Sequence, residues 1–198
     1  MNAVIIKYNA GNIYSVEQAL RRVGISPIVT DNPETICSAD RILLPGQGEA
    51  ATTMHYLREH KLDVLIRNLK QPVLGICIGQ QLMCAHSEEG DIDCLGIFDA
   101  EVKKFQAIHH EKIPHVGWNT LTDIKSDDLL RGIAPEEYAY FIHSYYVNPC
   151  DYTIATTNYI VPFSASLHKK NFYATQFHPE KSGTVGEKIL KNFLELKP

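Results

Sequence analysis

The chain has no excess of basic residues, and this argues against nucleic acid as a partner. Its 23 acidic residues outnumber its 19 lysines and arginines, and the formal net charge is -4. Nucleic-acid binding normally depends on a basic patch or stripe, and the sequence contains neither. It also lacks an apolar run long enough to cross a bilayer. We therefore expect neither nucleic acid nor a membrane as a partner.

Cysteine is sparse, and its spacing is not that of a metal site or a disulfide framework. The five cysteines are odd in number, and none forms a C-x-x-C pair. This pattern argues against structural disulfides and a zinc ribbon. The first residues also lack the basic stretch and apolar core of a secretory signal. We expect a reducing, cytoplasmic setting, and no metal at the histidines of AIHHEKIPH, where ligands at metal spacing are missing.

What the sequence does contain is an alternation of buried strands and helices. Apolar runs at 3–8, 25–30, 41–44 and 73–77 predict strands, and helical patterns separate most of them. Such alternation predicts a mostly parallel sheet. Several short strands after about residue 95 predict antiparallel additions beside it. We therefore predict an α/β fold: a single domain over 1–198, built as a three-layer sandwich with helices on both faces of the sheet.

Local signals place the ends of several helices. The turn NAGN at 9–12 precedes a helix that Asn12 would cap and Gly24 would end. Residues 49–69 look helical, in two pieces. Thr184 and Glu187 have the spacing of a capping box for a last helix.

The most informative stretch is PVLGICIGQQLMCAH, residues 72–86. Cys77 lies between Gly75 and Gly79 where a buried strand meets a predicted helix that includes Cys84. This is the thiol version of a nucleophile elbow, whose sharp turn needs glycines on either side. It would expose the sulfur at the carboxyl end of the sheet, beside a helix N-terminus that favours thiolate. A buried structural cysteine between chance glycines remains the simpler alternative, and we expect the other four cysteines to be unreactive.

The segment TQFHPEKS supplies the base that a thiol nucleophile needs. His178 and Glu180 are two residues apart, so in an extended segment their side chains point to the same side. Pro179 biases His178 toward that geometry. Glu180 would then fix the imidazole tautomer. A surface histidine beside a solvated glutamate is the alternative for this segment taken alone.

With these residues in view, GICIGQQ and QFHPEKS resemble the motifs of class I, triad-type glutamine amidotransferases, and the resemblance covers the whole chain. In that family a Cys-His-Glu triad hydrolyses glutamine to glutamate and ammonia, and ammonia passes to a synthase. KYNAGNIYSV, LPGQGEA, IPHVGWN and FIHSYYV resemble one branch in particular. Its synthase is a (βα)8-barrel cyclase that makes imidazole glycerol phosphate in histidine biosynthesis. The resemblance implies a 1:1 heterodimer with that cyclase, and no cofactor.

The resemblance also implies a role for each matched residue. It implies a triad of Cys77, His178 and Glu180; oxyanion donors at Gln47, Gly48 and Ile78; glutamine contacts at Gln81, Glu89, Ser144 and Tyr145; and a partner-facing side at His115, Trp118 and Asn119. Without it, Gln81 and Glu89 would be read as surface residues and Trp118 as core.

Two positions depart from the family pattern as we know it, where 47 is usually small or aliphatic and 80 is often Met. Here they are Gln47 and Gln80, and we expect the amide of Gln47 to bias the oxyanion loop. Other functions also remain open. They are an amidotransferase serving another synthase, a catalytically silent regulatory subunit, and a stand-alone thiol peptidase or γ-glutamyl hydrolase.

Overall fold

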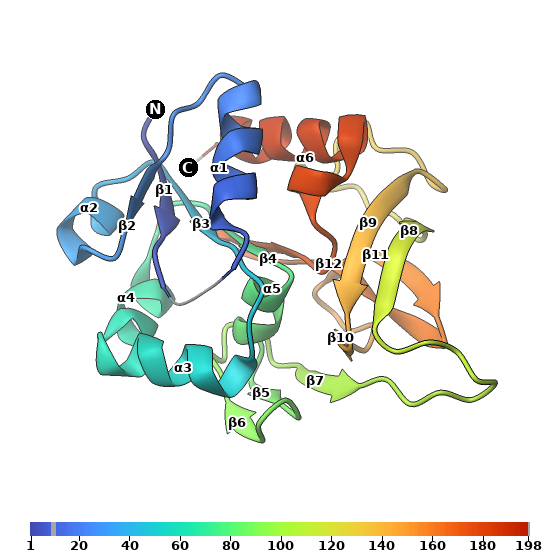
Figure 1. Ribbon diagram of the computed structural model, residues 1–198. Coiled ribbons are helices and arrows are strands. Elements are labelled where there is room, and N and C mark those ends of the chain that lie inside the picture. Colours follow the sequence, from blue (N-terminus) through green and yellow to red (C-terminus); the bar gives the residue numbers. More distant parts are fainter. Residues whose placement is uncertain (9–10, 198) are drawn as a thin grey trace.

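A seven-stranded sheet forms the centre of the computed structural model, which describes residues 1–8 and 11–197 (Figure 1). Its strands, in the order β11-β12-β13-β4-β3-β1-β2, are β11 (Thr153–Tyr159), β12 (Val161–Lys169), β13 (Phe172–Thr175), β4 (Val73–Ile76), β3 (Arg41–Leu44), β1 (Ala3–Ile6) and β2 (Ile28–Thr30). From β13 to β2 all pairings are parallel, whereas β11 and β12 add on antiparallel at one edge. The predicted α/β fold class, with a mostly parallel sheet, is confirmed.

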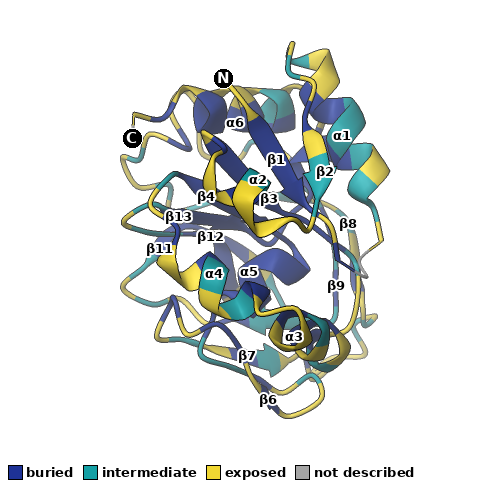
Figure 2. Cartoon of the chain, turned by 90° about the vertical axis from the view of Figure 1, so that its left-hand side faces the viewer, coloured by how far each residue is buried: buried dark blue, intermediate teal, exposed yellow. Residues whose placement is uncertain are grey.

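Helices cover both faces of this sheet (Figures 1 and 2). One face carries α1 (Ile13–Arg22) and α6 (Gly183–Glu195); the other carries α2 (Pro33–Cys37), α3 (Ala50–Glu59), α4 (Leu62–Asn68) and α5 (Ile78–Leu82). Alternate residues of the strands point to opposite faces: Ile5 packs with the α1 and α6 side, and Val4 and Ile6 with the other. Burial on both faces explains why these strands read as continuous apolar runs.

Two smaller sheets stand beside the central one. A four-stranded sheet has the order β10 (Tyr145–Val147), β7 (Glu101–Lys104), β5 (His86–Ser87) and β6 (Ile92–Asp93). A ribbon pairs β8 (His115–Thr120) with β9 (Tyr138–His143). The expected antiparallel additions are therefore present. The short strand at 172–175, which the sequence grouped with these additions, is an exception, because β13 lies parallel to β4 within the core.

Several predicted element boundaries were wrong. The first two strands are shorter than predicted, at 3–6 and 28–30, and the helix after Cys77 ends at Leu82, so Cys84 lies beyond it. Helix α6 begins at Gly183, which leaves no capping box at Thr184. The hydroxyl of Ser182 instead donates to the His178 carbonyl at 2.7 Å.

Other local predictions hold, except that the Asn12 side chain does not cap α1. Residues 49–69 do form two helices, and Gly24 follows α1 at φ +88°, which suits glycine. Of the predicted turn at 9–12, residues 9 and 10 lie outside the described part of the chain. Asn12 stands at the N-cap position, but its side chain is directed to Glu180 rather than to the helix. Across the described residues, no helix has the length and apolar character needed to span a membrane.

Candidate active site

Cys77 sits on a strained turn between β4 and α5. Its backbone has φ 54° and ψ -104°, a region that residues with a side chain rarely adopt. A Cβ atom on Gly79 would lie 1.9 Å from the Leu44 carbonyl oxygen, and one on Gly75 would lie 2.7 Å from the Gly79 carbonyl carbon. Only glycine fits at both positions, which confirms the predicted elbow geometry.

A cavity of about 290 Å³ opens in front of this turn. Its lining includes six residues expected to bind glutamine or its oxyanion: Gln47, Gly48, Ile78, Gln81, Glu89 and Ser144. The other four are Cys77, Pro114, Ile142 and His143, and the expected Tyr145 is not among the lining residues. The structure therefore brings most of the sequence-predicted set, from segments far apart in the chain, around one sulfur atom.

His178 and Glu180 form a fully buried pair behind Cys77. His178 Nδ1 lies 2.7 Å from Glu180 Oε1, and neither side chain is accessible to solvent. The route to this contact differs from the prediction. His178 is extended, at φ -98° and ψ 96°, but Glu180 belongs to a 3-10 turn, η1 (Pro179–Lys181). The turn, rather than a continuous extended segment, brings the carboxylate back to the ring.

The electrostatics of the pair favour an imidazolium. Burial alone lowers the pKa of His178, whereas its interactions with Cys77 and Glu180 raise it. The net result is a pKa of about 10. The other ring nitrogen, Nε2, is buried, and within the described residues it makes no hydrogen bond of ordinary geometry. It is thus the ring atom free to exchange a proton with the sulfur or with a substrate.

Amide groups surround the sulfur and the neighbouring backbone. Gln176 Nε2 lies 3.7 Å from Cys77 Sγ. Gln81 Nε2 donates to Gln176 Oε1 at 3.1 Å and to the Tyr145 carbonyl at 3.0 Å. Glu89 accepts from the Ala50 N–H at 2.8 Å, although burial raises its pKa in net effect. A carboxylate in this cavity can pair with the ammonium of a free amino acid.

The loop expected to supply oxyanion donors is tied to the segment after β1. The Gln47 N–H donates to the Gly11 carbonyl at 3.2 Å, and the Gly11 N–H donates to the Gln47 carbonyl at 2.8 Å. The Tyr8 hydroxyl donates to the Pro45 carbonyl. In this conformation one predicted donor, the Gln47 N–H, is already used. It can serve an oxyanion only after the loop rearranges.

Three residues near the site were not predicted from the sequence. Asn12 donates to Glu180 Oε1, Gln176 contacts Cys77, and His143 lines the cavity. Gln176 and His143 lie inside the quoted segments TQFHPEKS and FIHSYYV, so closer attention to those segments would have found them. Asn12 carried no such signal, because capping explained it equally well.

The residues expected to face a partner behave differently from one another. Trp118 is 55% exposed on β8, with Val116, two residues before it, at 53%. Asn119 is partly exposed. His115 is only 4% exposed, so its side chain is not available as a surface contact. That part of the prediction is corrected, because the His115 ring is buried on the inner side of β8, stacked on Tyr159 of β11.

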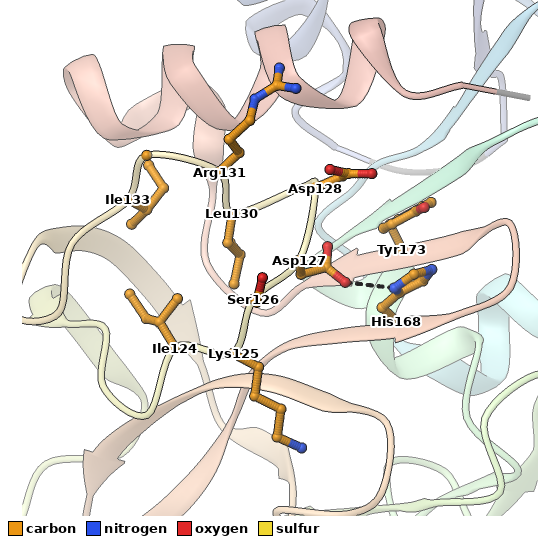
Figure 3. A pocket seen from close by; sticks show the side chains of 11 residues that line it. Ile124, Lys125, Ser126, Asp127, Asp128, Leu130, Arg131, Ile133, His168 and Tyr173 are labelled. Atoms are coloured by element: carbon orange, nitrogen blue, oxygen red, sulfur yellow. Dashed lines mark hydrogen bonds and ion pairs between the residues drawn. The ribbon is translucent and has the colours of Figure 1, made fainter.

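A larger hollow, of about 810 Å³, lies away from Cys77 (Figure 3). It is bordered by Lys125, Asp127, Asp128, Arg131, His168 and Tyr173 among others, and a contact of 2.6 Å joins His168 Nδ1 to Asp127 Oδ2. It contains no cysteine and none of the residues predicted for catalysis. We therefore place the candidate active site at the smaller cavity.

A strained cysteine turn backed by a buried His–Glu pair, on a parallel sheet, defines a thiol-dependent class of α/β protein. The sequence model of the family "Glutamine amidotransferase class-I" matches residues 4–196, and the chain belongs to that family. A solved structure described as a putative GMP synthase protein from Thermoplasma acidophilum has the same fold. Its TM-score is 0.77, at 22% identity over 98% of this chain and 92% of that one.

Individual relatives narrow the similarity to one kind of subunit. The chain is 58% identical to the imidazole glycerol phosphate synthase subunit HisH of Bacteroides fragilis, over 99% of this chain and all of that protein. It is 44% identical to the subunit of the same name from Yersinia pseudotuberculosis, again over 99% of this chain and all of the relative.

Proposed function

We propose that the chain is the glutaminase subunit of imidazole glycerol phosphate synthase, acting in histidine biosynthesis. The observation that carries the proposal is the strained Cys77 turn, set in a cavity together with Gln81 and Glu89. The full-length identity of 58% to a subunit of that name supports the choice of synthase. We extend the proposal to a single amidotransferase domain over residues 1–198, in the cytoplasm.

The proposed reaction uses the buried pair in two half-reactions. The Cys77 sulfur attacks the carboxamide carbon of glutamine, and His178 gives a proton to the departing ammonia as the C–N bond breaks. His178 then takes a proton from water, which attacks the thioester and releases glutamate and the thiol. Glu180 holds the ring throughout. The Ile78 N–H and the 47–48 loop would stabilise the oxyanion once the loop rearranges.

We propose that the β8–β9 ribbon faces the cyclase subunit, a (βα)8 barrel, in a 1:1 heterodimer. Val116 and Trp118 point to the same side of β8, and Tyr138 on β9 is also exposed. Exposed apolar groups gathered in this way are typical of interfaces. The ribbon also borders the cavity through His143, so ammonia formed there would be released close to the partner.

Ammonia release from glutamine tests this proposal. The chain is measured alone and after addition of the cyclase subunit with its ribonucleotide ligand, with Cys77→Ser as the control. We expect strong stimulation by the partner and complete loss in Cys77→Ser. Activity without stimulation would point to another synthase, and no activity in either case would favour a silent regulatory subunit.

A further inference from the structure

Two histidines outside the proposed triad are buried beside the active-site cavity. His115 on β8 and His143 on β9 face each other across the ribbon, at 4% and 6% exposure. Aromatic rings enclose them: His115 stacks on Tyr159 with ring centroids 4.0 Å apart, and His143 packs against Phe163 at 5.0 Å. Such burial is costly for a polar ring unless its nitrogen atoms have partners.

The hydrogen bonds of these rings can run in only one direction. His143 Nδ1 lies 2.7 Å from the Tyr145 carbonyl, which can only accept, so Nδ1 carries the proton. A neutral ring has one proton, so His143 Nε2 must accept, and it lies 3.0 Å from His115 Nδ1. His115 therefore also carries its proton on Nδ1.

The contact between Asn119 and His115 has the same donor-to-acceptor direction. His115 Nε2 is left as an acceptor, and the amide nitrogen of Asn119 lies 3.3 Å from it. Burial lowers the pKa of His115 to about 4 and that of His143 to about 3, which keeps both rings neutral near pH 7. From Asn119 through His115 and His143 to Tyr145, each donor thus faces the acceptor of the next residue.

At the other end, this row of hydrogen bonds reaches a residue that lines the cavity. The Tyr145 carbonyl accepts from His143 and also from Gln81, whose side chain lines the space in front of Cys77. Resting on the proposed glutaminase function, we propose that Asn119, His115 and His143 form a one-directional hydrogen-bond chain that positions the Tyr145 carbonyl and Gln81 for glutamine. His115 and His143 are then positioning residues, and Asn119 is the end nearest the exposed Trp118.

The tautomers provide the direct test. In water neutral histidine prefers the proton on Nε2, whereas the proposed hydrogen-bond chain requires the proton on Nδ1 of both His115 and His143. Nitrogen-15 NMR of the full chain, labelled at histidine, distinguishes the two forms. We expect two non-titrating histidines in the Nδ1–H form between pH 6 and 8, assigned by their loss in His115→Phe and His143→Phe. An Nε2–H signal from either residue would overturn the proposal.

Kinetics test the positioning role in the complex with the cyclase subunit. Removing both hydrogen bonds of the His115 ring in His115→Phe should raise KM for glutamine by about threefold to tenfold, with a smaller effect on kcat. The matched control is Tyr159→Phe, which keeps the ring stacked on His115. Tyr159 is not part of the hydrogen-bond chain. Modification of Cys77 by iodoacetamide, followed by peptide mass spectrometry, should proceed at the same rate in all three proteins.

The two proposals fail in different ways. If wild-type protein turns over no glutamine, the proposed function fails. The tautomers of His115 and His143 would still show whether the hydrogen-bond chain is present. If wild-type protein is active but His115→Phe matches Tyr159→Phe in KM, the positioning role is wrong. Slower modification of Cys77 in His115→Phe would also overturn it, because the effect would then be a general disturbance of the site.

Discussion

At the scale of single residues, the protonation of His178 depends on what surrounds it. Its pKa is the outcome of burial, which lowers it, against charge on Cys77 and the Glu180 contact, which raise it to about 10. The raised pKa favours a charged imidazolium at His178, held by the Glu180 carboxylate behind it. In the proposed reaction, that proton is the one given to the departing ammonia.

Removing the sulfur should lower the pKa of His178. In Cys77→Ala the interaction of the ring with the sulfur is lost, whereas Glu180 remains, so the ring should release its proton at a lower pH than in wild type. NMR titration of the His178 ring measures this directly. Cys37→Ser, which alters an exposed thiol, is the control. An unchanged titration in Cys77→Ala would show that the sulfur does not interact with the ring.

Sequence patterns identified the residues with distinctive local context but not those that support them. Cys77 is marked by its glycines, and His178 by its spacing to Glu180. Asn12 and Gln176 reach the site only through chain folding, and their residue types occur equally well in caps and on surfaces. The side-chain destination of Asn12 could not be predicted, because capping and contact with Glu180 require the same polar group at the same helix start.

At the scale of elements, the turn from β4 to α5 depends on close approach to β3. The position of Gly79 against the Leu44 carbonyl leaves no room for a methyl group. The parallel pairing of β3 with β4 fixes this distance, so neither strand can yield alone. The helix that follows is only five residues long, which makes the turn dependent on packing rather than on helix propensity.

Gly79→Ala should therefore destabilise the whole fold. We expect a loss of at least about 2 kcal/mol in the free energy of unfolding, as for overpacked cores. Urea denaturation measures it. Gly48→Ala is the matched control, since a Cβ there would lie 3.4 Å from Thr53 Oγ1, close to ordinary contact. Equal unfolding midpoints for the two variants would mean that β3 can move away at little cost.

The sheet illustrates how much of the architecture the sequence determined. Strands β1, β3 and β4 were visible because burial on both faces gives uninterrupted apolar runs. Strand β13, Phe172–Thr175, has mixed composition, and nothing local distinguished its parallel pairing with β4 from the hairpins around it. Pairing between distant segments is set by tertiary packing, which short-range patterns do not encode.

At the scale of the whole molecule, stability should depend on pH through a histidine far from the active site. His168 Nδ1 faces the Asp127 carboxylate (Figure 3). Nε2 lies 2.7 Å from the Lys170 carbonyl, so both nitrogens face acceptors. Burial lowers the pKa of His168, but these two acceptors outweigh it and raise the pKa above 6.5. Folding therefore favours the charged form of the ring.

The sign of the effect follows from the raised pKa. The stabilisation is complete below about pH 6.5, where the ring is charged even when unfolded, and is lost as pH rises through the higher folded pKa. Asp127→Asn should therefore lower stability at pH 6 more than at pH 9. Thermal unfolding across this range measures it, with the exposed Asp99→Asn as control. A loss independent of pH would show that the ring is neutral in the folded protein.

The pairing of β13 with β4 also has a consequence during protein synthesis. Cys77 leaves the ribosome about a hundred residues before His178. At ordinary rates of translation this interval is roughly 5–20 s. During it the thiol has neither its base nor the Thr175 carbonyl that accepts the Cys77 N–H at 2.7 Å. A nascent chain that ends before residue 178 therefore carries Cys77 without the histidine and the glutamate that lie behind it in the folded protein.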